Sequence, residues 1–138
     1  MNRDDRFVRT EESKREGAAF PIWRSFKCAG EGVWAVLARE RNMKIHVLVA
    51  LAAVLLCIVL PVPAWGPPIV AVCIGVVMAL ECVNTAIEAV VDLISPEWHE
   101  LAKRAKDAAA GATLIAALMS VVVAAFVYLP AVVSLLGW

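Results

Sequence analysis

Three long apolar segments of the chain decide what kind of fold it can adopt. They cover residues 45–65, 68–92 and 108–136. At ~1.5 Å per residue, a helix of about 20 residues crosses the ~30 Å hydrocarbon core of a bilayer. The 138-residue chain is also 62% hydrophobic, well above a soluble globular average. We therefore predict an all-α integral membrane protein with three transmembrane helices.

Basic residues mark which side of the membrane each connection faces. Ten of the thirteen Lys and Arg residues lie between Arg3 and Lys44. The other three are Lys103, Arg104 and Lys106. Because short loops rich in Lys and Arg stay in the cytoplasm, we predict that the N-terminus and the loop after residue 92 are cytoplasmic. The C-terminus at Trp138 is then on the outer side of a multi-pass protein.

The N-terminal region divides into two parts. Residues 1–19 have mixed charge and are expected to form a disordered cytoplasmic tail, and residues 20–138 form one membrane domain. Between residues 22 and 37, apolar and polar residues alternate with roughly helical spacing, and this stretch contains Trp23 and Trp34. The pattern predicts an amphipathic helix that lies in the membrane interface. The alternative is an amphipathic helix packed against the bundle.

The second apolar segment carries polar side chains in its second half. Four of them fall within one sector of a helix that turns about 100° per residue, with Asn84 beside that sector. These four are Glu81, Thr85, Glu88 and Asp92. Ionisable groups at membrane depth are costly and indicate a functional site. For Glu81 taken alone, the alternative is a structural hydrogen bond to a neighbouring helix.

The loop after this segment supplies the opposite charge. His99, Lys103, Lys106 and Asp107 recur there at helical spacing. Cations beside an acidic stripe suit a polyanion bridged by a metal ion, and Mg²⁺ prefers carboxylate oxygens together with substrate phosphates. We therefore expect a magnesium-dependent phosphate site here. For Lys103 and Arg104, the alternative is that they set the topology and contact anionic headgroups.

Two motifs carry a family resemblance. ECVNTAIEAVVD at residues 81–92, followed by HELAKRAKDAAAGATL at residues 99–114, resembles the bacterial diacylglycerol kinase and undecaprenol kinase family. These are small integral-membrane lipid kinases, and the resemblance extends over about residues 20–138. It implies an enzyme of the bacterial inner membrane that uses ATP and Mg²⁺ to phosphorylate a lipid alcohol. It also implies a homotrimer with active sites between subunits, and no nucleic-acid partner.

The same resemblance implies roles for single residues. Glu81 matches the proposed catalytic base of the family, and Glu40 and Glu88 match its acidic metal-binding positions. The nucleotide-binding positions are matched by Asn84, Asp92, Glu97, His99, Lys106 and Asp107. Small residues at positions 108–112 would permit the close helix packing that a trimer needs.

The sequence indicates the type of reaction more clearly than it indicates which lipid accepts the phosphate. The segments RNMKIH and AKDAAAGATL are closer to the undecaprenol kinase branch, whereas SPEWHEL resembles the diacylglycerol kinase branch. His46 stands where the diacylglycerol branch tends to have a carboxylate. We favour undecaprenol, phosphorylated in lipid recycling; the alternative is a diacylglycerol kinase that makes phosphatidic acid. A more distant alternative is a non-enzymatic proton-relay or transport subunit, which should carry acidic residues across the full membrane depth.

Overall fold

The computed structural model describes residues 22–137, and this part of the chain is helical and contains no strand. Its helices are α2 (Ile22–Arg39), α3 (Arg41–Val59), α4 (Gly66–Ile94) and α5 (Glu100–Leu135). The predicted all-α class is therefore confirmed. The predicted tail at residues 1–19 lies outside the described residues. The chain forms two units, residues 1–34 and 35–138, and the candidate site lies within the second.

Helix α2 begins in the first unit. Its Lys27 and Glu31 form an ion pair one helical turn apart, with Nζ 3.8 Å from Oε1 and both side chains exposed. Trp23 and Trp34 are also exposed, at 58% and 68%. The position of this helix at a membrane interface remains a prediction.

Helices α3, α4 and α5 are each long and apolar enough to cross a membrane. This confirms the three apolar helices expected from the sequence. Helix α4 has 29 residues and α5 has 36, which correspond to about 43 and 54 Å at ~1.5 Å per residue. Both exceed the ~30 Å hydrocarbon core. Each of these two helices is therefore longer than the apolar layer that it could cross.

Prolines set the turn between α3 and α4. The apolar run extends to residue 65, but α3 ends earlier because Leu60 is extended, with φ −98° and ψ 147°. The residue after it is Pro61, and a residue that precedes proline is disfavoured in the α-helical region. Helix α4 then starts with Pro67 and Pro68 in its first turn, where the missing N–H groups have no helical partner to lose.

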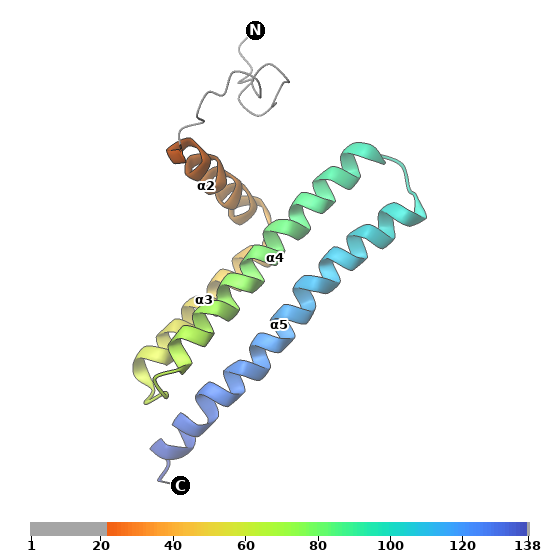
Figure 1. The fold of residues 1–138 in the computed structure, drawn as a ribbon. Coiled ribbons are helices and arrows are strands. Elements are labelled where there is room, and N and C mark those ends of the chain that lie inside the picture. The colour runs from red at the N-terminus through yellow and green to blue at the C-terminus, as the bar shows by residue number, and fades with distance from the viewer. Residues whose placement is uncertain (1–21, 138) are drawn as a thin grey trace. The chain divides into compact units, whose positions relative to one another are not determined.

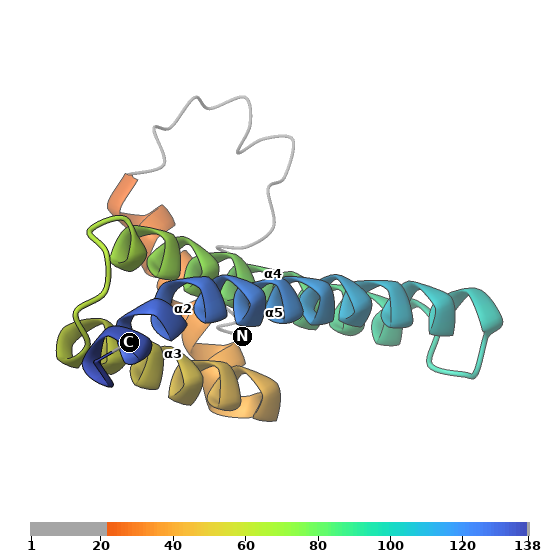
Figure 2. The same ribbon diagram turned by 90° about the horizontal axis from the view of Figure 1, so that it is seen from below.

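Helices α4 and α5 pack side by side and antiparallel, with α3 alongside α4 (Figures 1 and 2). At one end, Gly66 allows a close approach, since a Cβ added there would stand 2.9 Å from Cγ1 of Val127. At the other end, Lys106 reaches Asp92 across the α4–α5 loop. These two contacts show the register of α4 against α5.

The apolar side chains of the helices face mostly outward. In the described part, five hydrophobic residues are buried: Met43, Val70, Val77, Val127 and Ala131. Many large apolar side chains of all three long helices are exposed. This is the pattern expected where lipid, which is as apolar as the side chains themselves, replaces water around the protein.

One polar contact joins α3 to α5 within the apolar region. The Tyr128 hydroxyl donates to the carbonyl oxygen of Ala53 at 2.8 Å and lies 3.3 Å from Sγ of Cys57. A buried tyrosine hydroxyl needs such a partner. The contact therefore adds a specific link between helices that otherwise meet through apolar side chains.

Candidate active site

The polar stripe of α4 runs from a buried end to an exposed end. Glu81 is 2% exposed and Asn84 is 6% exposed, whereas the side chain of Asp92 is 66% exposed. Glu88 lies between these extremes. At ~1.5 Å per residue, Glu81 and Glu88 are about 10 Å apart along the helix. The stripe therefore offers carboxylates at different depths.

The buried end of the stripe is completed by the start of α3. The side chain of Asn42 lies beside the Glu81 carboxyl group. His46, Glu40 and Glu88 also lie within electrostatic range of this carboxyl group. The predicted base and both predicted metal-binding carboxylates are thus brought into one neighbourhood.

Two residues of this neighbourhood, Asn42 and His46, were not predicted to belong to the site. The sequence did carry a signal for them. They are four residues apart at the start of the first apolar segment, so a helix places both on one face. Which face meets Glu81 depends on how α3 packs on α4, and spacing alone does not give that.

Asn84 and Glu88 form a pair within α4. Nδ2 of Asn84 donates to Oε1 of Glu88 at 3.1 Å. Oδ1 of Asn84 is buried and has no hydrogen-bond partner within residues 22–137. Thr85, next along the chain, donates its hydroxyl to the carbonyl oxygen of Glu81 at 3.0 Å. Asn84 is therefore the member of the stripe with unused hydrogen-bonding capacity in the interior.

Glu40 stands at the junction of α2 and α3. It occupies the N-cap position of α3 with φ −83° and ψ 124°, and in the described part of the chain its carboxylate makes no capping hydrogen bond. Its side chain is half-buried. The carboxylate is therefore available for another ligand near Glu81.

The donor set suits Mg²⁺ better than a metal held only by protein. Among residues 22–137, no three His, Cys, Asp or Glu side chains are arranged to hold a metal ion. Mg²⁺ is commonly bound through one or two carboxylates together with substrate phosphates and water. Glu40 and Glu88 supply hard oxygen donors of that kind. These residues fit a magnesium ion that arrives with a phosphate substrate.

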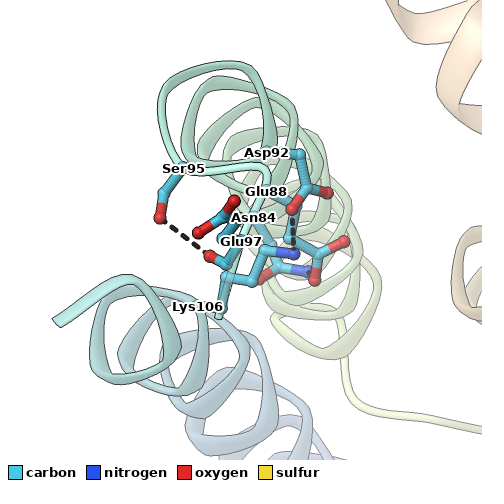
Figure 3. A network of polar contacts seen from close by, with 6 residues as sticks. All are labelled: Asn84, Glu88, Asp92, Ser95, Glu97 and Lys106. Carbon is cyan, nitrogen blue, oxygen red and sulfur yellow. Dashed lines mark hydrogen bonds and ion pairs between the residues drawn. The ribbon is translucent and has the colours of Figure 1, made fainter. Parts of the chain in front are cut away.

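A polar cavity of about 440 Å³ lies at the α4–α5 loop. Five of the six residues predicted to bind nucleotide line it: Asp92, Glu97, His99, Lys106 and Asp107. The sixth, Asn84, lies deeper on α4 beside Glu88 (Figure 3). The structure thus gathers most of these residues around one space, although their role remains a prediction.

Ion pairs and a helix cap organise this loop cavity. Nζ of Lys106 is 2.5 Å from Oδ1 of Asp92, so a cation of α5 is held against the end of α4 (Figure 3). A second ion pair joins Lys103 to Asp107. Nδ1 of His99 accepts from the N–H of Leu101 at 3.1 Å and so caps α5. Two cations and three carboxylates therefore border the cavity.

Trp98 also lines the loop cavity but was absent from the predicted site, whereas Lys103, which lines it too, was among the cations of the expected phosphate site. Trp98 is 80% exposed. It is the one aromatic residue in a short charged loop, which is a usable signal. An interfacial tryptophan is, however, common in membrane proteins without any ligand, so the sequence alone does not distinguish the two roles.

A second cavity, of about 300 Å³, is apolar and lies between α3, α4 and α5. Val77 and Met78, one turn before Glu81, line it from α4, and His46 lines it from α3. Glu81 therefore stands between an apolar cavity on one side and the polar stripe that leads to the loop cavity on the other.

Comparison with known proteins places these features in one family. A sequence model described as prokaryotic diacylglycerol kinase matches residues 27–128. The chain is 42% identical over 112 residues to the undecaprenol kinase of Bacillus subtilis (strain 168), which covers 79% of this chain and 89% of that protein. It is 42% identical over 113 residues to a diacylglycerol kinase of Synechocystis sp., covering 81% and 65%. It is 37% identical over 102 residues to the diacylglycerol kinase of Escherichia coli (strain K12), covering 72% and 84%. The chain therefore belongs to the prokaryotic diacylglycerol kinase family.

Proposed function

We propose that this lipid kinase transfers the γ-phosphate of ATP to the hydroxyl group of a membrane lipid alcohol, and that undecaprenol is its physiological acceptor. One observation carries the proposal: Glu81 is a buried carboxylate placed between an apolar cavity and a polar stripe that ends at a charged loop cavity. A lipid hydroxyl and a soluble triphosphate can meet only where such surroundings join.

The nucleotide is proposed to bind at the loop cavity. Lys106 and Lys103 supply positive charge there, and His99 and Trp98 supply hydrogen-bonding and stacking surfaces. Glu81 lies eleven residues before Asp92, which is about 16 Å along α4. A triphosphate that extends from the cavity along the stripe is thereby directed toward Glu81.

Glu81 is proposed to act as general base. It accepts the proton of the lipid hydroxyl while that oxygen attacks the γ-phosphorus, and the bond from phosphorus to the β-bridging oxygen breaks as ADP leaves. Asn42 lies beside this carboxyl group and is proposed to orient it. Positioned acid–base catalysis of this kind contributes about 10²- to 10⁴-fold.

Glu40 and Glu88 are proposed to hold Mg²⁺, with Asn84 supporting Glu88. When bound, Mg²⁺ neutralises charge on the triphosphate, which is most of what phosphoryl transfer requires. Asp92 keeps Lys106 directed toward the same region.

The lipid is proposed to enter sideways from the bilayer. The apolar cavity offers a place for a hydrocarbon chain, and its wall at Val77 and Met78 is one turn from Glu81. His46 lines this cavity and lies near Glu81, so its position suits a residue that contacts the hydroxyl end of the lipid.

Diacylglycerol is the second candidate acceptor. Relatives named for each lipid are equally similar, at 42% identity. The deciding experiment measures transfer of radiolabelled phosphate from ATP to undecaprenol and diacylglycerol in the same micelles, separated by thin-layer chromatography. We expect undecaprenol to be labelled faster at equal mole fraction. Preferential labelling of diacylglycerol supports the second candidate, and labelling of neither contradicts the proposed reaction.

We also propose a homotrimer in the bacterial inner membrane, with active sites completed between subunits. The α5 segment at residues 108–112 consists of small residues, which permit close helix contact. Cross-linking in detergent should give a species of three chains. An active monomer would contradict shared sites.

A further inference from the structure

Two buried polar atoms lack hydrogen-bond partners within residues 22–137, and they belong to facing helices. They are Oδ1 of Asn84 on α4 and Oγ1 of Thr113 on α5. Both residues are only 6% exposed. Leaving a buried polar group unpaired is costly, so two such groups in one region indicate that they share a partner or pair with each other.

The register of the helices brings the two residues to the same level. Asp92 pairs with Lys106 at one end, and Gly66 meets Val127 at the other. Counted from these contacts along antiparallel helices, the position opposite Thr113 falls between about residues 80 and 85 of α4. Asn84 lies within that interval.

Thr113 also lies on the face of α5 that meets α4. It is seven residues after Lys106 and fourteen before Val127, and both of these contact α4. Steps of seven residues return to nearly the same face of a helix, with a drift of only about 20° each. The hydroxyl of Thr113 is therefore placed toward the polar stripe rather than toward lipid.

The hydrogen bond to Glu88 determines which atom of the Asn84 side-chain amide needs a hydrogen-bond donor elsewhere. The Glu88 carboxylate can only accept hydrogen bonds when ionised, so Asn84 must present Nδ2 to it. Oδ1 then points elsewhere and requires a donor. A threonine hydroxyl is a donor of the kind required, and a buried water molecule can bridge two such polar groups where they do not meet directly.

We propose that Thr113 is a positioning residue: its hydroxyl donates to Oδ1 of Asn84, directly or through one water, and thereby fixes the amide that holds Glu88. The inference rests on the proposed function, because it assigns Glu88 to magnesium binding. Loss of a residue that orients a metal ligand without binding the metal itself commonly weakens metal affinity by about 10- to 100-fold.

The test substitutes Thr113→Val, which keeps the shape and removes the hydroxyl. We expect the Mg²⁺ concentration for half-maximal activity to rise by about tenfold, with turnover at saturating Mg²⁺ nearly unchanged. Binding of Mn²⁺ in place of Mg²⁺, followed by electron paramagnetic resonance in the presence of ATP without lipid, should weaken by a similar factor. Thr113→Ser should restore both values.

Ser134→Ala is the control, since its hydroxyl donates to the carbonyl oxygen of Ala131 in its own helix, outside both cavities; it should leave Mn²⁺ affinity unchanged. If Thr113→Val raises the unfolding temperature and leaves Mn²⁺ affinity as in the wild type, the hydroxyl is unpaired and the proposal is wrong. The same conclusion follows if Oδ1 of Asn84 binds the metal directly, because Thr113 then has no effect. If the valine variant does not fold, the Mg²⁺ dependence of activity and the Mn²⁺ affinity are measured for Thr113→Ala instead.

The two proposals fail in different ways. A wild-type protein that phosphorylates neither lipid contradicts the proposed function. Mn²⁺ binding still reports on Thr113 in that case, because it does not require turnover.

Discussion

Nζ of Lys106 on α5 lies 2.5 Å from Oδ1 of Asp92 at the end of α4. The two side chains are 35% and 66% exposed. An ion pair this exposed contributes about 0–1 kcal/mol to stability. Its significance therefore lies in where it holds a cation, at the border of the loop cavity, and not in holding the fold together.

Lys106→Met should raise the KM for ATP by about tenfold or more, since a hydrogen bond to a charged group is worth about 1.5–3 kcal/mol. The unfolding temperature should change little. Steady-state kinetics with varied ATP and a thermal unfolding assay check both. Arg104→Met is the control, because Arg104 is exposed on the same helix outside the cavity lining. An equal loss in both variants would show that only the net charge of the loop matters.

Glu81→Gln should spare folding and ATP binding but cut turnover by about 10²- to 10⁴-fold, because glutamine cannot accept the proton. Turnover per mole of folded protein and ATP affinity are the measurements. Retention of more than about a tenth of wild-type turnover, above what loss of a base allows, removes Glu81 from that role. A lower unfolding temperature, with activity reduced only in proportion to folded protein, indicates a structural Glu81.

Glu88→Ala and Glu40→Ala should each reduce phosphorylation severely and weaken magnesium-dependent ATP binding, because each removes a hard oxygen donor. Titration with Mg²⁺ at fixed ATP measures the effect. Glu31→Ala removes an exposed glutamate paired within α2 and serves as control. Unchanged magnesium dependence in the two site variants rules them out as ligands.

Trp98→Ala should raise the KM for ATP by about tenfold, in line with the ~1–3 kcal/mol that base–aromatic stacking contributes. Trp98→Phe should lose less. Trp65→Ala, at the opposite end of α4 and also exposed, is the control for general effects of an interfacial tryptophan. If both alanine variants behave alike, Trp98 is a membrane anchor and not a nucleotide contact.

A reporter enzyme fused after Trp138 should be active only on the outer side of the membrane, because α5 crosses it once from a basic loop. A reporter placed within the α4–α5 loop should be active only in the cytoplasm. The opposite result for either fusion overturns the proposed topology and the cytoplasmic position of the loop cavity.

Sequence predicted the features that depend on local patterns. The lengths of the apolar segments predicted the three long helices. Helical spacing predicted that Glu81, Asn84 and Glu88 lie along one stripe of α4. Spacing also suits the pairing of Lys103 with Asp107, which are four residues apart within α5.

Contacts between helices could not be predicted from the spacing of residues in the sequence. The pairing of Lys106 with Asp92 depends on how the α4–α5 loop reverses the chain. The position of Asn42 and His46 beside Glu81 depends on the rotation of α3 against α4. The early end of α3 at Val59 shows a different limit: hydropathy continues past it, and Pro61 stops the helix for reasons of backbone geometry.

The length of α5 ties the enzyme to the thickness of its membrane. The apolar part of α5, residues 108–135, is about 42 Å long at ~1.5 Å per residue, so in a ~30 Å hydrocarbon core it must tilt or project beyond the core, to an extent that depends on the bilayer thickness. Because α4 packs along α5, we expect both helices to respond together. We expect a thinner bilayer to increase the mismatch and tilt the pair further, which would change the depth of Glu81 relative to the headgroups. We therefore expect the chain length of the bilayer lipids to affect how readily the hydroxyl group of the lipid substrate reaches the γ-phosphate of ATP.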